Sequence, residues 1–160
     1  MPYPRGSQWR RWDLHVHTPE SFAWQAGDWD QYVNALERVE GVSVLGITDY
    51  FSIDGYKKIL DYRKEGRLRN FDLILPNIEF RLSCLVPARG SADNPRRVNF
   101  HVVFSDEVPV EDIEEQFIHM LSFTYDGDTS GGESRSLTRR AIEGGADAFA
   151  KRERKLNLEG

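Results

Sequence analysis

The stretch Val42-Ser-Val-Leu-Gly-Ile-Thr48 is a nearly continuous run of β-prone residues. Such a run is typical of a strand that other elements cover on both faces. The preceding segment predicts a helix from Asp28 to Gly41, because Asp28 with Gln31 three residues on has the form of a helix start. The apolar residues of this helix recur at helical spacing, at Tyr32, Val33, Leu36 and Val39. A covering helix followed by a buried strand favours an α/β fold.

Helical patterns also follow this strand. One begins near Ser52 or Asp54 and stops by Gly66, and another begins at about Val110. The apolar positions are Tyr56, Ile59 and Leu60 in the first, and Ile113, Phe117, Met120 and Leu121 in the second. Both segments are therefore expected to present one apolar side to a core.

Three further strands are predicted, one before the first helix and two between the second and third helices. They cover Trp12–His17, Phe71–Leu85 with an interruption at Pro76, and Val98–Phe104. Strands that alternate with helices predict a parallel sheet with right-handed crossovers. The expected fold class is thus α/β.

Residues 88–96 and 125–133 are dense in Gly, Asp, Ser or Asn, and are predicted to be loops. Beyond them, residues 136–142 and 147–156 each predict a helix, and no further strand is expected. The length fits one domain, residues 1–160, but lies below the ~200 residues that a complete (β/α) barrel usually needs. The chain is therefore expected to stop partway round a barrel.

The composition, with 39% hydrophobic and 29% charged residues, is that of an ordinary soluble globular protein. No apolar run approaches the ~20 residues of a membrane span, and the N-terminal arm, residues 1–11, lacks the apolar stretch of a secretory signal. The single cysteine, Cys84, allows no internal disulfide, which makes a cytoplasmic location the default. The final pair Glu159-Gly160 is a candidate cloning scar.

The formal charge of −5 argues against a broad basic surface for duplex nucleic acid. It leaves open a nucleotide or a nucleic-acid strand that reaches a metal, because bound divalent ions supply positive charge that the sequence sum omits.

Two histidines lie one residue apart in the first strand. Alternate residues of a strand share a face, so Asp13, His15 and His17 point one way. The backbones of the two histidines then lie ~6.6 Å apart. Both imidazoles can reach one ion with bonds of ~2.0–2.1 Å, although incidental strand histidines are an equally simple reading of this pattern alone.

Other metal-ligating residues fall on the later strands. Asp49 ends the second strand, Glu79 lies in the third and His101 in the fourth. The carboxyl ends of parallel strands surround one depression, which is where α/β proteins place their sites. Histidine and carboxylate ligands suit Zn²⁺, Mn²⁺ or Fe²⁺.

These residues carry a family resemblance. His15-Val-His17, Thr48-Asp49, Asn77-Ile-Glu79 and Asn99-Phe-His101 resemble the successive motifs of the PHP (polymerase and histidinol phosphatase) domain. The match runs from about Arg5 to Leu121. The closer resemblance is to the N-terminal PHP-type domain of bacterial proteins that continue into an SMC-like or AAA-like ATPase. The stretches that carry it are RGSQWRRWDLHVHTPESF, GITDYFSIDGYKK, PNIEFRL and NFHVVFSDE.

The resemblance implies a distorted seven-stranded (β/α) barrel, here its N-terminal portion, that holds two or three metals for phosphoester hydrolysis. His15 and His17 would hold one ion, Glu79 would bridge it to a second, and His101 would bind that second. Asp49 would be a catalytic residue and ligand, or a support behind the ligands.

The chain also departs from the family pattern. Tyr50 replaces the histidine of the Thr-Asp-His motif, and Phe22 and Ala23 stand where some relatives place another ligand. A closing Asp-x-His motif does not occur in these residues. These departures leave a third metal with fewer candidate ligands and weaken the case for catalytic activity.

Substrate phosphate is expected to contact arginine, because guanidinium matches phosphate oxygens in bidentate fashion. The main candidates are Arg81 and Arg97, and Arg89 and Arg96 lie nearby. Solvated loop charges are the structural alternative for each of them.

Structural alternatives also exist for six other residues. Asp49 can cap the turn before Ser52, and Tyr50 is expected to pack rather than to act. His119, four residues after Glu115, is expected to be a solvated helix residue, and Cys84 a packed one. Trp9 and Trp12 either stack on a nucleic-acid base or, as we expect, pack the arm against the domain.

Three functions compete. The leading one is a metal-dependent phosphoric ester hydrolase, a nuclease or a nucleotide or small-molecule phosphatase, at the front of a larger ATPase-containing cytoplasmic protein. The alternative is a degenerate PHP module with a structural or regulatory role. A third, metal-dependent hydrolysis of a non-phosphate bond, shares the His-x-His strand.

Overall fold

A computed structural model describes most of the first three quarters of the chain. The described residues are 9–21, 27–88, 91–124, 134–138 and 140, with side chains left out at 83–85, 88, 91–95, 123–124 and 135. The chain divides into two compact units, Met1–Val108 and Pro109–Gly160. Each unit is described by itself.

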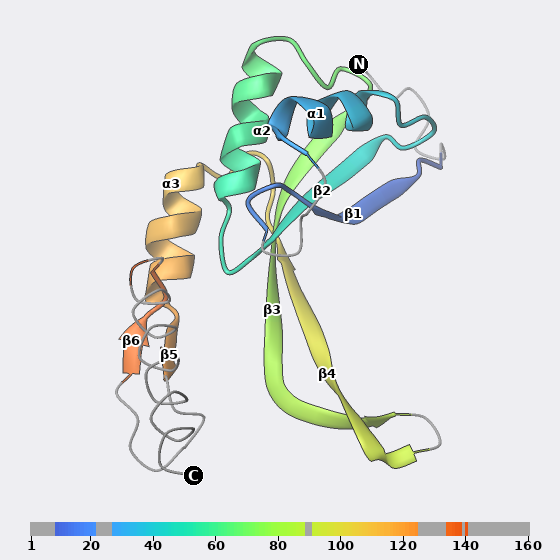
Figure 1. Ribbon diagram of the computed structural model, residues 1–160. Coiled ribbons are helices and arrows are strands. Elements are labelled where there is room, and N and C mark those ends of the chain that lie inside the picture. The colour runs from blue at the N-terminus through green and yellow to red at the C-terminus, as the bar shows by residue number, and fades with distance from the viewer. Residues whose placement is uncertain (1–8, 22–26, 89–90, 125–133, 139, 141–160) are drawn as a thin grey trace. The chain divides into compact units, whose positions relative to one another are not determined.

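The first unit is built on a four-stranded sheet with the order β1-β2-β3-β4 (Figure 1). Its strands are β1 (Trp12–His17), β2 (Val44–Tyr50), β3 (Leu73–Ala88) and β4 (Ser91–Val103). The first three strands are parallel, joined through two helices, which confirms the mixed α/β class.

The prediction that the fourth strand is parallel is wrong, because β4 runs antiparallel to β3. The two strands follow each other without a helix, and a parallel partner needs a crossover of a dozen or more residues. The loop predicted over residues 88–96 is wrong for its described part, because Ala88 belongs to β3 and residues 91–96 belong to β4.

The interruption predicted at Pro76 does not occur. β3 continues through Pro76, which lies opposite Ile47 of β2, and its carbonyl accepts a hydrogen bond from the Phe104 amide at 3.0 Å. Proline lacks only the N–H, so its carbonyl still serves the backbone.

Two helices connect the parallel strands, α1 (Trp29–Glu37) and α2 (Asp54–Lys64). The predicted start of α1 is confirmed, since the Asp28 side chain accepts from the Gln31 amide at 2.9 Å. The prediction that Val39 lies on the apolar face is wrong, because α1 ends earlier and Val39 is exposed. The buried helix residues are Tyr32, Val33 and Leu36 of α1, and Gly55, Tyr56 and Ile59 of α2.

The core of this unit lies between the helices and the sheet. Ile47 and Ile78 from the strands and Val33 and Ile59 from the helices are almost fully buried, together with Leu68 from the α2–β3 connection. The two helices also contact each other at the surface, where the Tyr62 hydroxyl donates to Asp30 at 2.8 Å. Apolar burial of this kind is the main stabilising contribution to the fold.

Beyond the sheet, β3 and β4 form a two-stranded extension. β2 pairs with β3 only as far as Glu79, whereas β4 pairs with β3 through to Ala88. Figure 1 shows the two strands continuing together away from β1 and β2. We call residues 80–88 and 91–100 the β3–β4 arm.

In its described residues, the second unit contains an irregular helical segment at 110–120 and a small sheet. The segment consists of α3 (Val110–Asp112), a π-helical turn η1 (Ile113–Phe117) and a 3₁₀ turn η2 (Ile118–Met120). The sheet pairs β5 (Ser122–Thr124) antiparallel with β6 (Ser134–Ser136).

Three expectations for the second unit need correction. Met120 was expected on the apolar face but is 76% exposed, because the π turn shifts the helical register, and Ile118 is buried instead. The expectation of no further strand is wrong, as is a helix beginning at Ser136, which lies in β6. The loop at 125–133 and the helix at 147–156 lie outside the described residues.

Within the described residues, none of the helices is both long and apolar enough to cross a membrane.

Candidate metal centre

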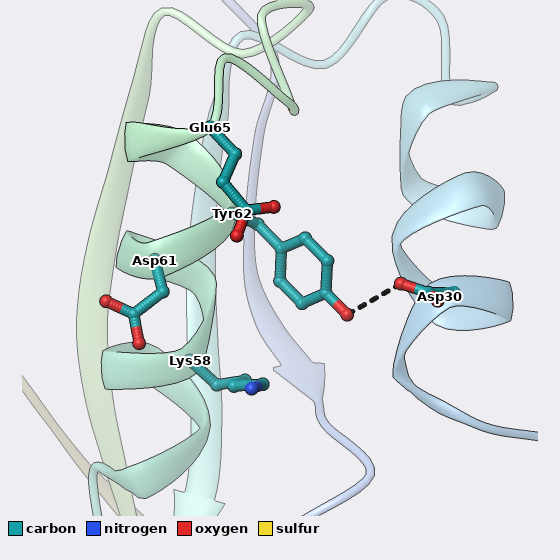
Figure 2. Close-up of a pocket in the computed structure, with 5 residues that line it drawn as sticks. All are labelled: Asp30, Lys58, Asp61, Tyr62 and Glu65. Atoms are coloured by element: carbon teal, nitrogen blue, oxygen red, sulfur yellow. Dashed lines mark hydrogen bonds between the residues drawn. The ribbon is translucent and has the colours of Figure 1, made fainter.

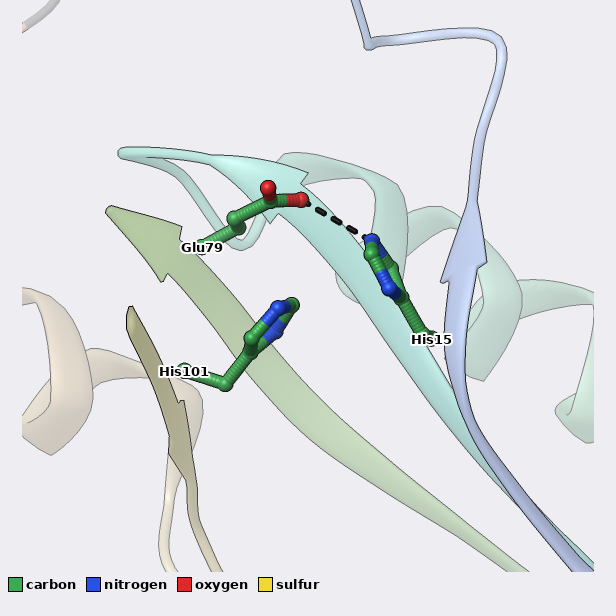
Figure 3. Close-up of side chains that lie close together, drawn as sticks. All are labelled: His15, Glu79 and His101. Atoms are coloured by element: carbon green, nitrogen blue, oxygen red, sulfur yellow. Dashed lines mark hydrogen bonds and ion pairs between the residues drawn. The ribbon is translucent and has the colours of Figure 1, made fainter. Parts of the chain in front are cut away.

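Three strands position a cluster of imidazoles around one carboxylate. His15 and His17 are alternate residues of β1, Glu79 lies on β3, and His101 lies on β4 directly opposite Glu79. Figure 3 shows His15, Glu79 and His101 pointing toward one another. The ligand atoms of these three residues lie within 4.8 Å of one another. We call His15, His17, Glu79 and His101 the His/Glu cluster.

The atoms of one half of the cluster form a nearly equilateral triangle. Nε2 of His15 lies 3.0 Å from Oε2 of Glu79 and 3.1 Å from Nε2 of His17. Nε2 of His17 lies 3.1 Å from the same Glu79 oxygen. The prediction that the two imidazoles share a face of the sheet is confirmed. The Glu79 side chain lies on the same face.

The triangle has the dimensions of a metal-ligand set. For bonds of about 2.0–2.1 Å, ligand atoms in a tetrahedral or octahedral shell lie about 3.0–3.4 Å apart. Two imidazole nitrogens 3.1 Å apart also need a proton or a cation between them, because neutral imidazole carries only one N–H. The donor set therefore fits a divalent ion.

Burial of Glu79 gives a second, independent indication. Its side chain is fully buried, and among the described residues Oε1 has no hydrogen-bond partner. A buried carboxylate is costly unless it is paired or ligates a metal. Its other oxygen, Oε2, is approached by Nε2 of His15 and of His17, which carry positive charge only when protonated, so a metal ion would supply a fixed positive partner.

Burial lowers the pKa of His17 below its usual value of 6.5. The neighbouring Glu79 carboxylate acts against this effect, while His15 and His101 add to it. A lowered pKa keeps the imidazole neutral near pH 7. The neutral form is the one that binds metals.

Asn77, two residues before Glu79, connects the cluster to the sheet. Its buried amide nitrogen donates to the Leu14 carbonyl at 2.6 Å and to Thr48 Oγ1 at 2.9 Å, and lies 3.1 Å from Nδ1 of His101. With Nδ1 as acceptor, a neutral His101 carries its proton on Nε2. Ligation through Nε2 would need the proton on Nδ1. Asn77 would then have to turn its amide so that the oxygen, and not the nitrogen, faces Nδ1. Sequence reasoning missed this role, although Asn77 shares the face of Glu79 in an alternating strand.

Asp49 lies beside the start of α2, and its described contacts are with protein groups. Its carboxylate accepts from the Thr18 hydroxyl at 2.9 and 3.0 Å, from the Thr18 amide at 3.3 Å, and from the Gly55 amide. Burial raises its pKa to about 6, and the Thr18 hydrogen bonds only partly offset that rise. Asp49 thus holds the turn after β1 against the first turn of α2, and does not belong to the His15, Glu79 and His101 group.

Tyr50 and Arg81 border the cluster. The Tyr50 ring stacks on His17 with centroids 5.0 Å apart, and the Arg81 guanidinium lies 5.9 Å from the Tyr50 ring centroid. Tyr50 thus packs on a proposed ligand. The arginines Arg81, Arg96 and Arg97 are exposed, and Arg89 lies outside the described residues.

The other candidate residues are His119, Cys84 and the two tryptophans Trp9 and Trp12. His119 is exposed on η2, as expected, and the Cys84 side chain lies outside the described residues. Trp9 is 98% exposed and Trp12 is 57% exposed, so the expected packing of these two rings on the domain is wrong, whereas the Arg11 carbonyl of the N-terminal arm accepts a hydrogen bond from the Ser43 amide at 2.9 Å.

A small surface pocket of about 220 Å³ lies between α1 and α2 (Figure 2). The Tyr62 hydroxyl donates to Asp30 there, and this hydrogen bond raises the pKa of Tyr62 to about 12. The phenol therefore remains protonated at neutral pH. The pocket is lined by Asp30, Lys58, Asp61, Tyr62 and Glu65, and shares no residue with the His/Glu cluster.

Comparison of the chain with protein-family models, curated proteins and solved structures finds no significant match. The class that the fold and the cluster define is therefore a mixed α/β protein with a candidate metal centre at the junction of its parallel and antiparallel strands.

Proposed function

We propose that this chain is a metal-dependent phosphoesterase domain of the PHP type. The observation that carries the proposal is the buried Glu79 carboxylate, which has one oxygen 3.0 and 3.1 Å from two imidazoles and the other without a hydrogen-bond partner among the described residues. The β1-α1-β2-α2-β3 order also agrees with the N-terminal portion of a distorted (β/α)7 barrel.

In this proposal the four residues of the His/Glu cluster share two ions, each Zn²⁺, Mn²⁺ or Fe²⁺. His15 and His17 hold one, His101 holds the second, and Glu79 lies between them with two oxygens to offer. Bound divalent ions activate water near neutral pH and neutralise charge on phosphoryl oxygens. Asp49 acts behind the ligands by holding the turn that follows His17.

The protein groups around the cluster would bind and orient the substrate. Arg81 is exposed beside Tyr50 and can donate two parallel hydrogen bonds to a phosphate. Arg97 lies farther out on β4. Burial of Glu79 and His17 keeps water away from one side of the cluster, which strengthens electrostatic interactions there.

A non-catalytic module is the second candidate. Its support is Tyr50, which occupies the place of a family histidine and packs its ring on His17. In either form, we propose a cytoplasmic domain that works with an SMC-like or AAA-like ATPase domain of the same native chain.

The test is elemental analysis of the chain purified without chelator, followed by hydrolysis assays on bis(p-nitrophenyl) phosphate, p-nitrophenyl phosphate and p-nitroanilide amides. We expect bound Zn, Mn or Fe, its loss in His17→Ala and Glu79→Gln, and its retention in the matched control His119→Ala. Metal with phosphoester turnover supports the hydrolase. Metal without turnover favours the non-catalytic module, amide turnover favours the third function, and no metal after incubation with excess Mn²⁺ and Zn²⁺ contradicts the proposal.

A further inference from the structure

The face of the sheet that carries the His/Glu cluster continues onto the β3–β4 arm. Glu79 pairs with His101, and the next pair on the same face is Arg81 with Asn99. Arg97 lies two residues from Asn99 along β4, beyond a register shift between the Arg81–Asn99 and Leu85–Arg97 pairs. Polar and basic residues therefore continue outward from the cluster along the arm.

The charge of the arm differs from that of the rest of the chain. Residues 81–99 contain four arginines and one aspartate, a formal charge of +3, in a chain whose formal charge is −5. Arg81, Arg96 and Arg97 are exposed, and no carboxylate among the described residues forms an ion pair with them. Exposed guanidinium groups such as those of Arg81 and Arg97 are suited to a polymer of phosphates.

We propose that the β3–β4 arm binds the phosphate backbone of a single nucleic-acid strand and leads it to the His/Glu cluster. This inference rests on the proposed function and names its substrate class. Arg81 and Arg97 contact successive parts of the strand, and Asn99 donates to a phosphate or a base between them.

A single strand suits this surface better than a duplex. Glu79 is fully buried and the His17 side chain is only 22% exposed, so a phosphate must bend inward to reach the cluster. A duplex is stiff over about 150 base pairs, whereas a single strand turns at each nucleotide. The acidic remainder of the chain also disfavours the wide contact that a duplex makes.

The test is fluorescence anisotropy with a labelled single strand of about 15 nucleotides, in the presence of EDTA so that no metal is bound. We expect the affinity to fall with salt, and the slope of log K against log salt to decrease by about 0.7 for each of Arg81→Ala and Arg97→Ala. Between about 50 and 200 mM salt, the fall in affinity should therefore be about 2.6-fold smaller for each lost contact.

Matched variants separate charge from fold. Arg38→Ala removes an exposed arginine outside the arm and should leave the slope unchanged, while Arg97→Lys should retain it. Slopes for Arg81→Ala and Arg97→Ala that equal the slope for Arg38→Ala would overturn the inference. So would tighter binding of the matching duplex, or no binding of the single strand.

The metal experiment fails independently of this one. Glu79→Gln should lose metal but retain the single strand in EDTA, and Arg97→Ala should retain metal. Absence of metal with arm binding intact overturns the proposed function alone. Intact metal and phosphoester turnover without arm binding overturns this inference alone.

Discussion

Glu79 of β3 and His101 of β4 lie directly opposite each other in the antiparallel part of the sheet. Their side chains share the face of His15 and His17 because of this register. A slip of one residue between β3 and β4 would move His101 to the opposite face, while the rest of the sheet kept its pairing. The candidate metal centre therefore depends on the pairing of a hairpin, in addition to the parallel strands.

Divalent metal should stabilise the folded chain. A ligand that binds only the folded state at 100 times its dissociation constant adds about 2.7 kcal/mol to the free energy of unfolding. Thermal unfolding with Zn²⁺ or Mn²⁺ added to EDTA-treated protein should show this increase, and Glu79→Gln should abolish it. His119→Ala is the control that keeps it. An equal increase in parent and Glu79→Gln would place the metal elsewhere.

Replacing Asn77 by leucine, which has a similar volume, should destabilise the fold. The Leu14 carbonyl would lose the hydrogen bond from the Asn77 amide, and Thr48 Oγ1 would lose the hydrogen bond from the same amide. We expect these losses to cost about 1–3 kcal/mol. Urea unfolding measures the difference. Asn34→Leu, at an exposed position where the amide oxygen accepts one hydrogen bond from Arg67 at 2.8 Å, should cost less, about 0.5–1 kcal/mol. A neutral Asn77→Leu would show that the strand contacts of this amide do not stabilise the sheet.

The pH dependence of stability should report the buried carboxyl of Asp49. Because burial raises its pKa from 3.8 in the unfolded chain to about 6 in the fold, its stabilising contribution is complete below about pH 4 and is lost as the pH rises through 6. In metal-free protein, the free energy of unfolding of Asp49→Asn, relative to that of the parent, should therefore rise by about 1–3 kcal/mol between pH 4 and pH 8. Urea unfolding at both pH values measures this shift, and a difference independent of pH would contradict it.

Gly46 of β2 should not tolerate a side chain. A Cβ there would lie 2.6 Å from the carbonyl oxygen and 2.7 Å from the Cα of Leu14, both backbone atoms of β1 next to its bulge. Gly46→Ala must therefore push β1, and should cost about 1–3 kcal/mol and weaken metal binding by His15. Gly41→Asn is the matched control, since Gly41 has open space and a left-handed φ of 73° that asparagine tolerates. Equal stability of Gly46→Ala and the parent would refute this reading.

The sequence by itself determined the local features of the fold. The Asp28 cap and the spacing of Tyr32, Val33 and Leu36 specify α1, because capping and helical periodicity act within a few residues. The alternation of His15 and His17 likewise placed both imidazoles on one face.

Tertiary structure decided the partners of these local features. The antiparallel direction of β4 and the pairing of Glu79 with His101 depend on hydrogen bonds between strands, which periodicity along one strand does not encode. The contacts of Asn77 with Leu14 and Thr48 span three strands for the same reason. Long-range pairing also made Asp49 the partner of Thr18, because burial between the turn after β1 and the first turn of α2 sets which atoms face its carboxylate. Residue type and spacing thus gave the candidate ligands, and strand register decided which of them meet.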